Sequence, residues 1–137
     1  MRIIFFAIFV LGLAGTSVEL LLLNHYETLL QVIPLVLIAL VLVVTAWHLM
    51  FERHASLVAL RAATAVFIAA GGLGIALHYR GNVGFQKEID PSIQGFDLFS
   101  KAIHAKVPPA LAPASMIWFG LLGLACTYLP QKRRESL

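Results

Sequence analysis

LVALRAATAVFIAAGGLGIAL, residues 57–77, is a continuous apolar run interrupted by a single charged residue, Arg61. About 20 apolar residues in a helix, each rising about 1.5 Å, are enough to cross the hydrocarbon core of a bilayer. Small residues recur along the run in alternating steps of three and four, which places them on one helix face. They are Ala62, Ala65, Ala69, Gly72 and Ala76. Because such faces let helix backbones approach closely, the run predicts a transmembrane helix with a packing face.

Three further apolar runs have the length of membrane-spanning helices. They cover residues 3–23, 29–49 and 111–129. The first and the last carry pairs of glycines three residues apart, which again share a helix face. These are Gly12 and Gly15 in the first run and Gly120 and Gly123 in the last. The sequence therefore predicts an all-α integral membrane protein, a bundle of four transmembrane helices in a single domain.

The first run also has features of a secretory signal peptide, because Arg2 precedes an apolar stretch that is followed by small residues. However, hydrophobicity resumes at Val18 and continues to Leu23, beyond the usual length of a signal-peptide core. We interpret the run as a retained transmembrane helix.

Composition supports a membrane location. Of the 137 residues, 60% are hydrophobic and only 12% are charged, which a soluble domain of this length cannot accommodate. The formal charge of +3 does not indicate nucleic-acid binding, because the basic residues are spread over the predicted helix ends. Their one cluster is Lys132-Arg133-Arg134, which suits contact with anionic lipid headgroups. The single cysteine, Cys126, lies in the last run and is interpreted as a small buried hydrophobe.

The predicted outer loop, residues 78–109, connects the third and fourth runs. Its first half, 81–91, is rich in turn-forming residues and shows little periodicity. Its second half places Phe96, Phe99 and Ile103 at steps of three and four, with polar residues opposite. This pattern predicts a short amphipathic helix that lies at the membrane surface.

Basic residues set the expected orientation. With a cytoplasmic N-terminus, six Lys and Arg residues lie inside and four lie outside, and the positive-inside rule favours this arrangement. We therefore expect both termini, including the basic tail at 130–137, in the cytoplasm. The general form of the chain suggests a bacterial inner membrane.

Several polar residues are predicted to gather at the outer surface. The first two runs are joined by a turn that contains His25 and Glu27, while His78 ends the third run and His104 lies near the surface helix. Imidazoles from two helix ends could bind haem or a transition metal, with Glu27 and His104 as further ligands. The alternative is that these rings simply favour the headgroup region. The same structural interpretation applies to His48 on the inner side, and Ser56 is a candidate N-cap for the third helix.

Catalytic signatures are absent from the sequence. The Gly71-Gly72-Leu73-Gly74 stretch lacks the strand and the Lys-Ser/Thr of a nucleotide-binding loop. The leading functional hypothesis is therefore a non-enzymatic accessory or structural subunit. It would act through helix contacts, with other membrane proteins or with itself, and through its outer loop. The alternatives are a haem- or metal-binding redox protein that uses His25 and His78, and a component of an oligomeric transporter or channel. A further alternative is an enzyme that acts on a lipid or lipid-linked substrate, which would require the outer-loop groups to converge at the headgroup level; these are Arg80, Glu88, Asp90 and His104.

Overall fold

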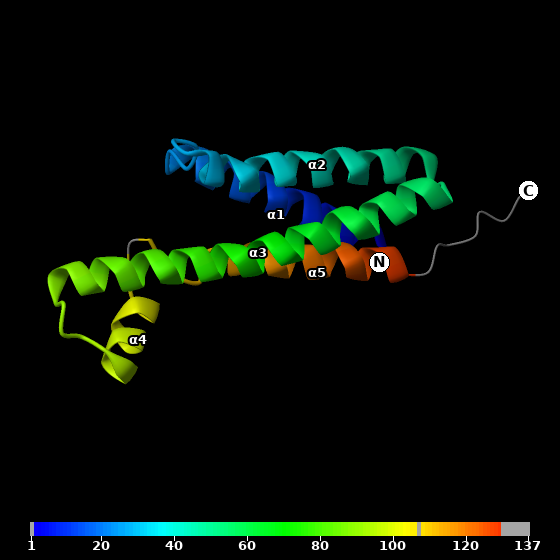
Figure 1. Ribbon diagram of the computed structural model, residues 1–137. Coiled ribbons are helices and arrows are strands. Elements are labelled where there is room, and N and C mark those ends of the chain that lie inside the picture. Colours follow the sequence, from blue (N-terminus) through cyan, green and yellow to red (C-terminus); the bar gives the residue numbers. More distant parts are fainter. Residues whose placement is uncertain (1, 107, 130–137) are drawn as a thin grey trace, which may run out of the picture. The chain divides into compact units, whose positions relative to one another are not determined.

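The computed structural model describes residues 2–106 and 108–129, and this part of the chain is all-helical, as the sequence predicts (Figure 1). It contains five helices, which are α1 (Arg2–Leu22), α2 (Leu29–Phe51), α3 (His54–Ile89), α4 (Gly95–Ile103) and α5 (Ala114–Tyr128). The predicted basic tail, 130–137, lies outside the described residues.

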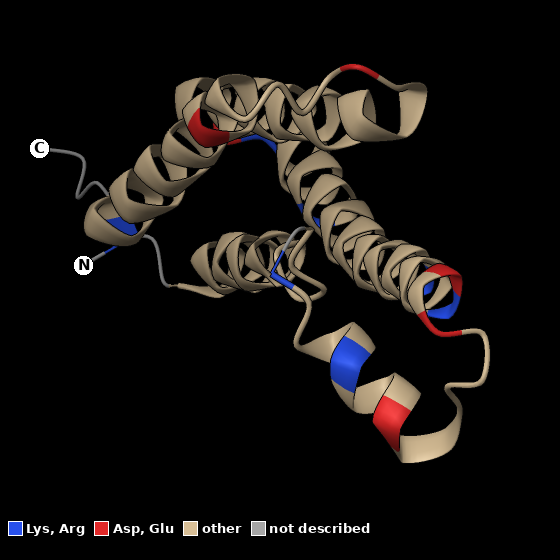
Figure 2. Ribbon diagram, turned by 90° about the vertical axis from the view of Figure 1, so that its left-hand side faces the viewer, with Lys and Arg blue, Asp and Glu red and all other residues tan. Residues whose placement is uncertain are grey.

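Three of these helices, α1, α2 and α3, are long and apolar enough to cross a membrane. Their mean hydropathies over 18 residues are 2.2, 2.8 and 1.8. The second contains no Lys, Arg, Asp or Glu, so its ribbon is tan throughout in Figure 2. It begins with a capping box, in which the Thr28 hydroxyl accepts from the Gln31 amide while the Gln31 side chain accepts from the Thr28 amide. Local sequence thus explains where α2 starts.

The fourth predicted span is shorter in the structure. The sequence predicts a helix over 111–129, whereas α5 covers the 15 residues Ala114–Tyr128. At about 1.5 Å per residue this helix is roughly 22 Å long, less than the hydrocarbon thickness of about 30 Å. The residues before it form turns, with the Ala112 amide bonded to the Pro109 carbonyl and the Ala114 amide to the Leu111 carbonyl. A fourth crossing therefore stays a prediction.

The third helix is longer than the sequence predicts at both ends. It begins at His54, so Ser56 lies in its first turn and is not its N-cap. It also continues to Ile89, and the prediction of an irregular, turn-rich segment from residue 81 is wrong. Gly81 and Gly84 were the turn signals, but each costs only about 1 kcal/mol inside a helix, which tertiary contacts can offset. At 36 residues, α3 is roughly 54 Å long, well beyond the thickness of a bilayer core.

Contacts divide the chain into two compact units. The first comprises Met1–Ile68 and Phe119–Leu137, and so contains α1, α2, the first part of α3 and most of α5. In it, α1 and α2 form an antiparallel hairpin whose buried residues include Phe9, Leu13 and Val41. Phe67 of α3 and Cys126 of α5 are also fully buried, which confirms the interpretation of Cys126.

The second unit, Ala69–Trp118, contains the rest of α3, α4 and the segment that leads into α5. Asn82 connects its parts, because its buried amide donates to the carbonyls of Ala102 and Pro108, both at 3.1 Å. The ring of Tyr79 also contacts that of Phe99, with centroids 6.0 Å apart. These contacts explain why the chain stays helical past residue 80. The short helix predicted from Phe96, Phe99 and Ile103 is α4, and its placement at a membrane surface stays a prediction.

Candidate functional site

Three of the predicted packing glycines are used inside the first unit. A Cβ atom on Gly12 would collide with the ring of Phe119, and one on Gly120 would collide with the side chain of Ile68. A Cβ atom on Gly123 would lie 2.7 Å from Phe9 Cζ. Glycine at these positions therefore allows α1, α3 and α5 to approach one another closely. Gly15, in contrast, has no atom within 4 Å of the position of a Cβ atom.

The small residues of α3 have a different environment. All five of the predicted packing positions on this helix are exposed. They are Ala62, Ala65, Ala69, Gly72 and Ala76, and we call them the exposed α3 stripe. The buried residues of the helix, among them Leu60, Thr64 and Phe67, follow the same steps of three and four on the opposite face. The packing inside the described chain thus uses one face of α3 and leaves the small-residue face open.

The predicted histidine ligands are divided between the units. His25 lies in the turn between α1 and α2, in the first unit, together with Glu27. His78 and His104 belong to the second unit, where their Nδ1 atoms donate to the carbonyls of Pro109 (3.0 Å) and Ser100 (2.8 Å). A carbonyl only accepts, so in each ring the proton resides on Nδ1.

A metal centre gains no support from these residues. Across residues 2–106 and 108–129, no three His, Cys, Asp or Glu side chains are gathered where they could hold a metal ion. The ligand set of His25, Glu27, His78 and His104 therefore stays a prediction, as does the haem pair His25 and His78.

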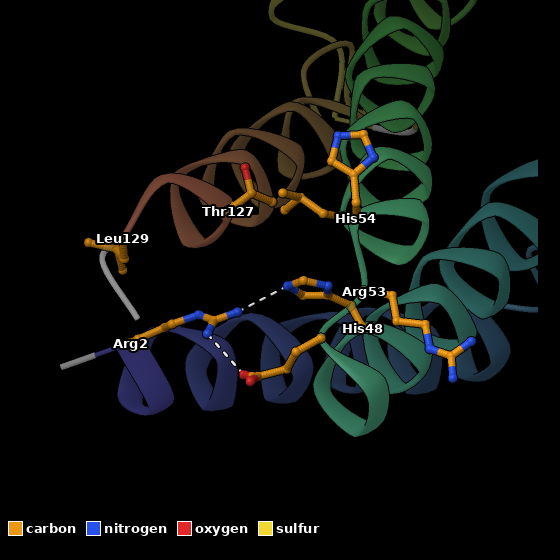
Figure 3. Close-up of a pocket in the computed structure, with 8 residues that line it drawn as sticks. Arg2, His48, Arg53, His54, Thr127 and Leu129 are labelled. Carbon is orange, nitrogen blue, oxygen red and sulfur yellow. Dashed lines mark hydrogen bonds and ion pairs between the residues drawn. The ribbon is translucent and has the colours of Figure 1, made fainter. Parts of the chain in front are cut away.

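The structure instead assembles a polar network at one end of the first unit. Arg2, the first residue of α1, forms an ion pair with Glu52 (Nη1 to Oε1, 3.2 Å) and contacts Nε2 of His48 at 3.0 Å (Figure 3). On the other side of the His48 ring, Nδ1 lies 3.0 Å from the hydroxyl oxygen of Ser56. Ser56 also donates to the carbonyl of Arg53, at 2.8 Å. We call Arg2, His48, Glu52 and Ser56 the Arg2–Ser56 network.

Donor chemistry fixes the direction of every bond in this network. A guanidinium group has only donors, so Nε2 of His48 accepts from Arg2 and carries no proton. The Ser56 hydroxyl donates its one hydrogen to the Arg53 carbonyl, so Nδ1 of His48 must donate to the Ser56 oxygen. His48 is therefore the neutral tautomer with its proton on Nδ1. Both His48 and Ser56 are buried, and each hydrogen-bonding atom of the imidazole has a partner.

Beside the network is a cavity of about 150 Å³. It lies within the first unit, where α1 and α3 begin and α2 and α5 end (Figure 3). Its lining is formed by Arg2, His48, Glu52, Arg53, His54, Leu57, Thr127 and Leu129. Thr127 accepts a hydrogen bond from Arg61 Nε at 3.1 Å. The cavity is thus lined mainly by polar and charged side chains, but the guanidinium group of Arg53 points away from it and lies over the ring of Phe51 (Figure 3).

Backbone geometry singles out Glu52 within this site. It follows the last residue of α2 with φ 46° and ψ 33°, the left-handed region that favours glycine or asparagine at the end of a helix. Its amide donates to the carbonyl of His48, which closes the helix. Glu52 therefore holds an unfavourable backbone conformation, and it is also the residue whose side chain pairs with Arg2. Backbone strain that is retained in this way is typical of functional positions.

The sequence predictions missed the network but contained a signal for it. A short turn joins two antiparallel helices, so positions equidistant from the turn lie side by side. The centre of the 23–28 turn is midway between Arg2 and Leu49, which places Arg2 beside the end of α2. Counting from the turn would therefore have brought Arg2 and His48 together.

Comparison with known proteins gives no relative. No protein-family model, no curated protein and no solved structure matches the chain.

Proposed function

We propose that this protein is a small, non-enzymatic accessory or structural subunit in the membrane. It would act by packing laterally against other membrane helices. Three helices long and apolar enough to cross a bilayer support the membrane location. We further propose the four-span arrangement, in a bacterial inner membrane, with both termini in the cytoplasm and α4 on the outer surface.

The exposed α3 stripe is the observation that carries this proposal. Other small residues, such as Gly12 and Gly123, are covered by neighbouring side chains in the first unit. The five positions of the stripe are exposed in the described chain. Their side chains are small, so they offer little area for contact with lipid tails. In a bilayer, helix association depends on close backbone approach and packing, which small residues at this spacing favour. A helix from a second copy or from another membrane protein suits this face.

Cysteine crosslinking in native membranes tests the proposal. The variant Ala69→Cys places a thiol in the middle of the stripe, and Val36→Cys places one on an exposed position of α2 as the matched control. We expect a crosslinker with one thiol-reactive and one photoreactive group to couple the first variant to a partner and not the second. A product of twice the chain mass, 15.0 kDa, identifies a second copy, and any other mass identifies a different subunit.

The opposite result is equally clear. If both variants stay uncoupled, and the protein leaves its native membrane as a monomer in mild detergent, lateral packing through α3 is wrong.

A further inference from the structure

We propose that three aromatic side chains of the second unit contact the headgroup layer of the bilayer and anchor α4 to lipid. They are Tyr79 on α3 and Phe96 and Phe99 on α4, and we call them the outer aromatic cluster. The inference goes beyond lateral packing and does not depend on the exposed α3 stripe. It rests on the proposed crossing of α3, and it adds to the outer position proposed for α4 the side chains that contact lipid.

The apolar face of α4 is only partly covered by the described chain. Ala102 is fully buried, whereas Phe99 is 48% exposed and Phe96 is 78% exposed. The rings of the two phenylalanines lie 6.3 Å apart, measured between centroids. The opposite side of the helix and its C-cap carry exposed polar residues, which are Asp97, Lys101 and His104. Exposed rings on one side and polar groups on the other are typical of a helix that lies at a lipid–water interface.

Contacts with α3 determine the height of α4 above the apolar run, which ends at Leu77 (Figure 1). The ring of Phe99 lies 6.0 Å from that of Tyr79, and the Asn82 amide donates to a carbonyl of α4 at 3.1 Å. Tyr79 and Asn82 follow Leu77 by two and five residues, or roughly 3–8 Å along the helix. The headgroup layer extends about 5–8 Å beyond the hydrocarbon core on each side. With α3 across the bilayer, α4 is therefore held at the level of the headgroups.

The contact between Phe99 and Tyr79 lies on the side of the cluster that is nearer the apolar run. Side chains on a helix tilt toward its N-terminus, so the ring of Tyr79 is directed back toward Leu77. The chain also returns at this level, because Nδ1 of His78 donates to the carbonyl of Pro109 at 3.0 Å. The aromatic contact is therefore close to the point where the chain leaves the apolar run and comes back to it.

A lipid surface suits the cluster better than a second protein does. Burying an aromatic side chain covers about 150–250 Å², so Phe96 and Phe99 together contribute at most about 500 Å². Each partner in a stable protein interface buries about 800 Å². Aromatic rings at the edge of the hydrocarbon core need no such area, because each ring is favoured there by itself. The bilayer is therefore the occupant that this surface fits.

Spin labels on the full chain in phosphatidylcholine liposomes test the proposal. A nitroxide attached to a cysteine reports its depth, because oxygen concentrates in hydrocarbon whereas a nickel chelate stays in water. Cys126 is buried, so a cysteine introduced on the surface is the one that reacts. We expect Phe96→Cys to give a severalfold higher ratio of oxygen to nickel collision rates than Lys101→Cys, which lies on the opposite side of α4.

Two further positions calibrate the depth. Leu73→Cys places the label on an exposed position within the apolar run and should give the ratio of hydrocarbon. Phe85→Cys replaces an exposed phenylalanine eight residues after Leu77, roughly 12 Å further along α3, and should give the ratio of water. We expect the ratio at position 96 to lie closer to that at position 73 than the ratio at position 85 does. Circular dichroism checks that each variant is helical, and Ile103→Cys, two turns along the same face, repeats the measurement if Phe96→Cys does not fold.

Three results would overturn the lipid anchor. A water ratio at position 96 with a hydrocarbon ratio at position 73 would overturn the anchor and leave the membrane location intact. Water ratios at both positions would overturn the anchor together with the crossing of α3. Low collision rates with both reagents at position 96, with dipolar broadening between labels, would mean that a second copy covers the cluster in place of lipid. Crosslinking through Ala69 tests lateral packing in a separate experiment, so the two proposals fail separately.

Discussion

His48 forms hydrogen bonds through both ring nitrogens, so its removal leaves one donor and one acceptor without a partner. In His48→Ala, a guanidinium donor of Arg2 loses its acceptor, and the buried Ser56 hydroxyl loses its donor. We expect the free energy of unfolding to fall by about 1–3 kcal/mol, the typical cost of leaving buried polar groups unpaired. Thermal unfolding in detergent measures the change. The exposed neighbour His54 is the control, because His54→Ala should change stability by less than about 0.5 kcal/mol.

Asp90 provides a second prediction for a single residue, this time outside the apolar spans. Its carboxylate accepts from the Ser92 hydroxyl (2.6 Å) and from the Ser92 amide (3.0 Å), and these bonds lower its pKa. The charged form is therefore favoured in the folded chain, so the stabilisation is complete at neutral pH and is lost as the pH falls below about 4. We expect Ser92→Ala to raise the Asp90 pKa, which an NMR titration of the carboxyl carbon would measure. An unchanged titration curve would show that the hydroxyl has no part in the shift.

At the scale of the element, neighbouring glycines of α3 are predicted to behave differently. A Cβ atom on Gly71 would lie 3.0 Å from the Pro113 carbonyl oxygen and 2.9 Å from Ile117, whereas one on Gly72 would meet nothing within 4 Å. We expect Gly71→Ala to destabilise the protein by about 1–3 kcal/mol through overpacking. Gly72→Ala should be neutral or stabilising by up to about 1 kcal/mol, because alanine favours the helix. Similar unfolding temperatures for the two variants would contradict this difference.

The packing of α4 against α3 is predicted to depend on Asn82. Asn82→Ala removes the only side chain shown to bond both the Ala102 and the Pro108 carbonyls in the described part of the chain. We expect the amides of α4 to exchange hydrogen faster, while those of α1, in the other unit, keep their rates. Mass-spectrometric hydrogen exchange in detergent compares the two helices in one experiment. Unchanged exchange in α4 would mean that the aromatic contact between Tyr79 and Phe99 holds it without the asparagine.

These elements also show what a sequence can and cannot predict here. The first two apolar runs, 3–23 and 29–49, agree closely with α1 and α2, because length and composition are enough to predict a helix that could cross a bilayer. The continuation of α3 was missed, because Gly81 and Gly84 are local turn signals while the bonds of Asn82 connect residues 20 and 26 positions apart. The spacing of small residues indicated a packing face, but Leu60, Thr64 and Phe67 have equally helical spacing. Periodicity alone could not determine which face the chain itself would bury.

At the scale of the whole molecule, the four-span topology makes a direct prediction. An even number of crossings places both termini on one side, and the basic residues favour the cytoplasm. We expect a fluorescent protein fused after Leu137 to fluoresce, whereas an alkaline phosphatase fused there stays inactive because it needs export. Fusion after residue 94, in the predicted outer loop, should give the reverse. An active phosphatase at the C-terminus would mean that α5, at 15 residues, does not cross.

Cys126 gives the molecule a built-in reporter of its own opening. It is the one cysteine of the chain, so it forms no disulfide within it. Its thiol is fully buried, and burial alone shields it from reagents. A thiol reagent can therefore react with Cys126 only when the helices around it separate. The rate of modification then reports how often this local opening occurs. The same property means that a cysteine introduced on an exposed face, such as the one in Ala69→Cys, reacts first and needs no cysteine-free background.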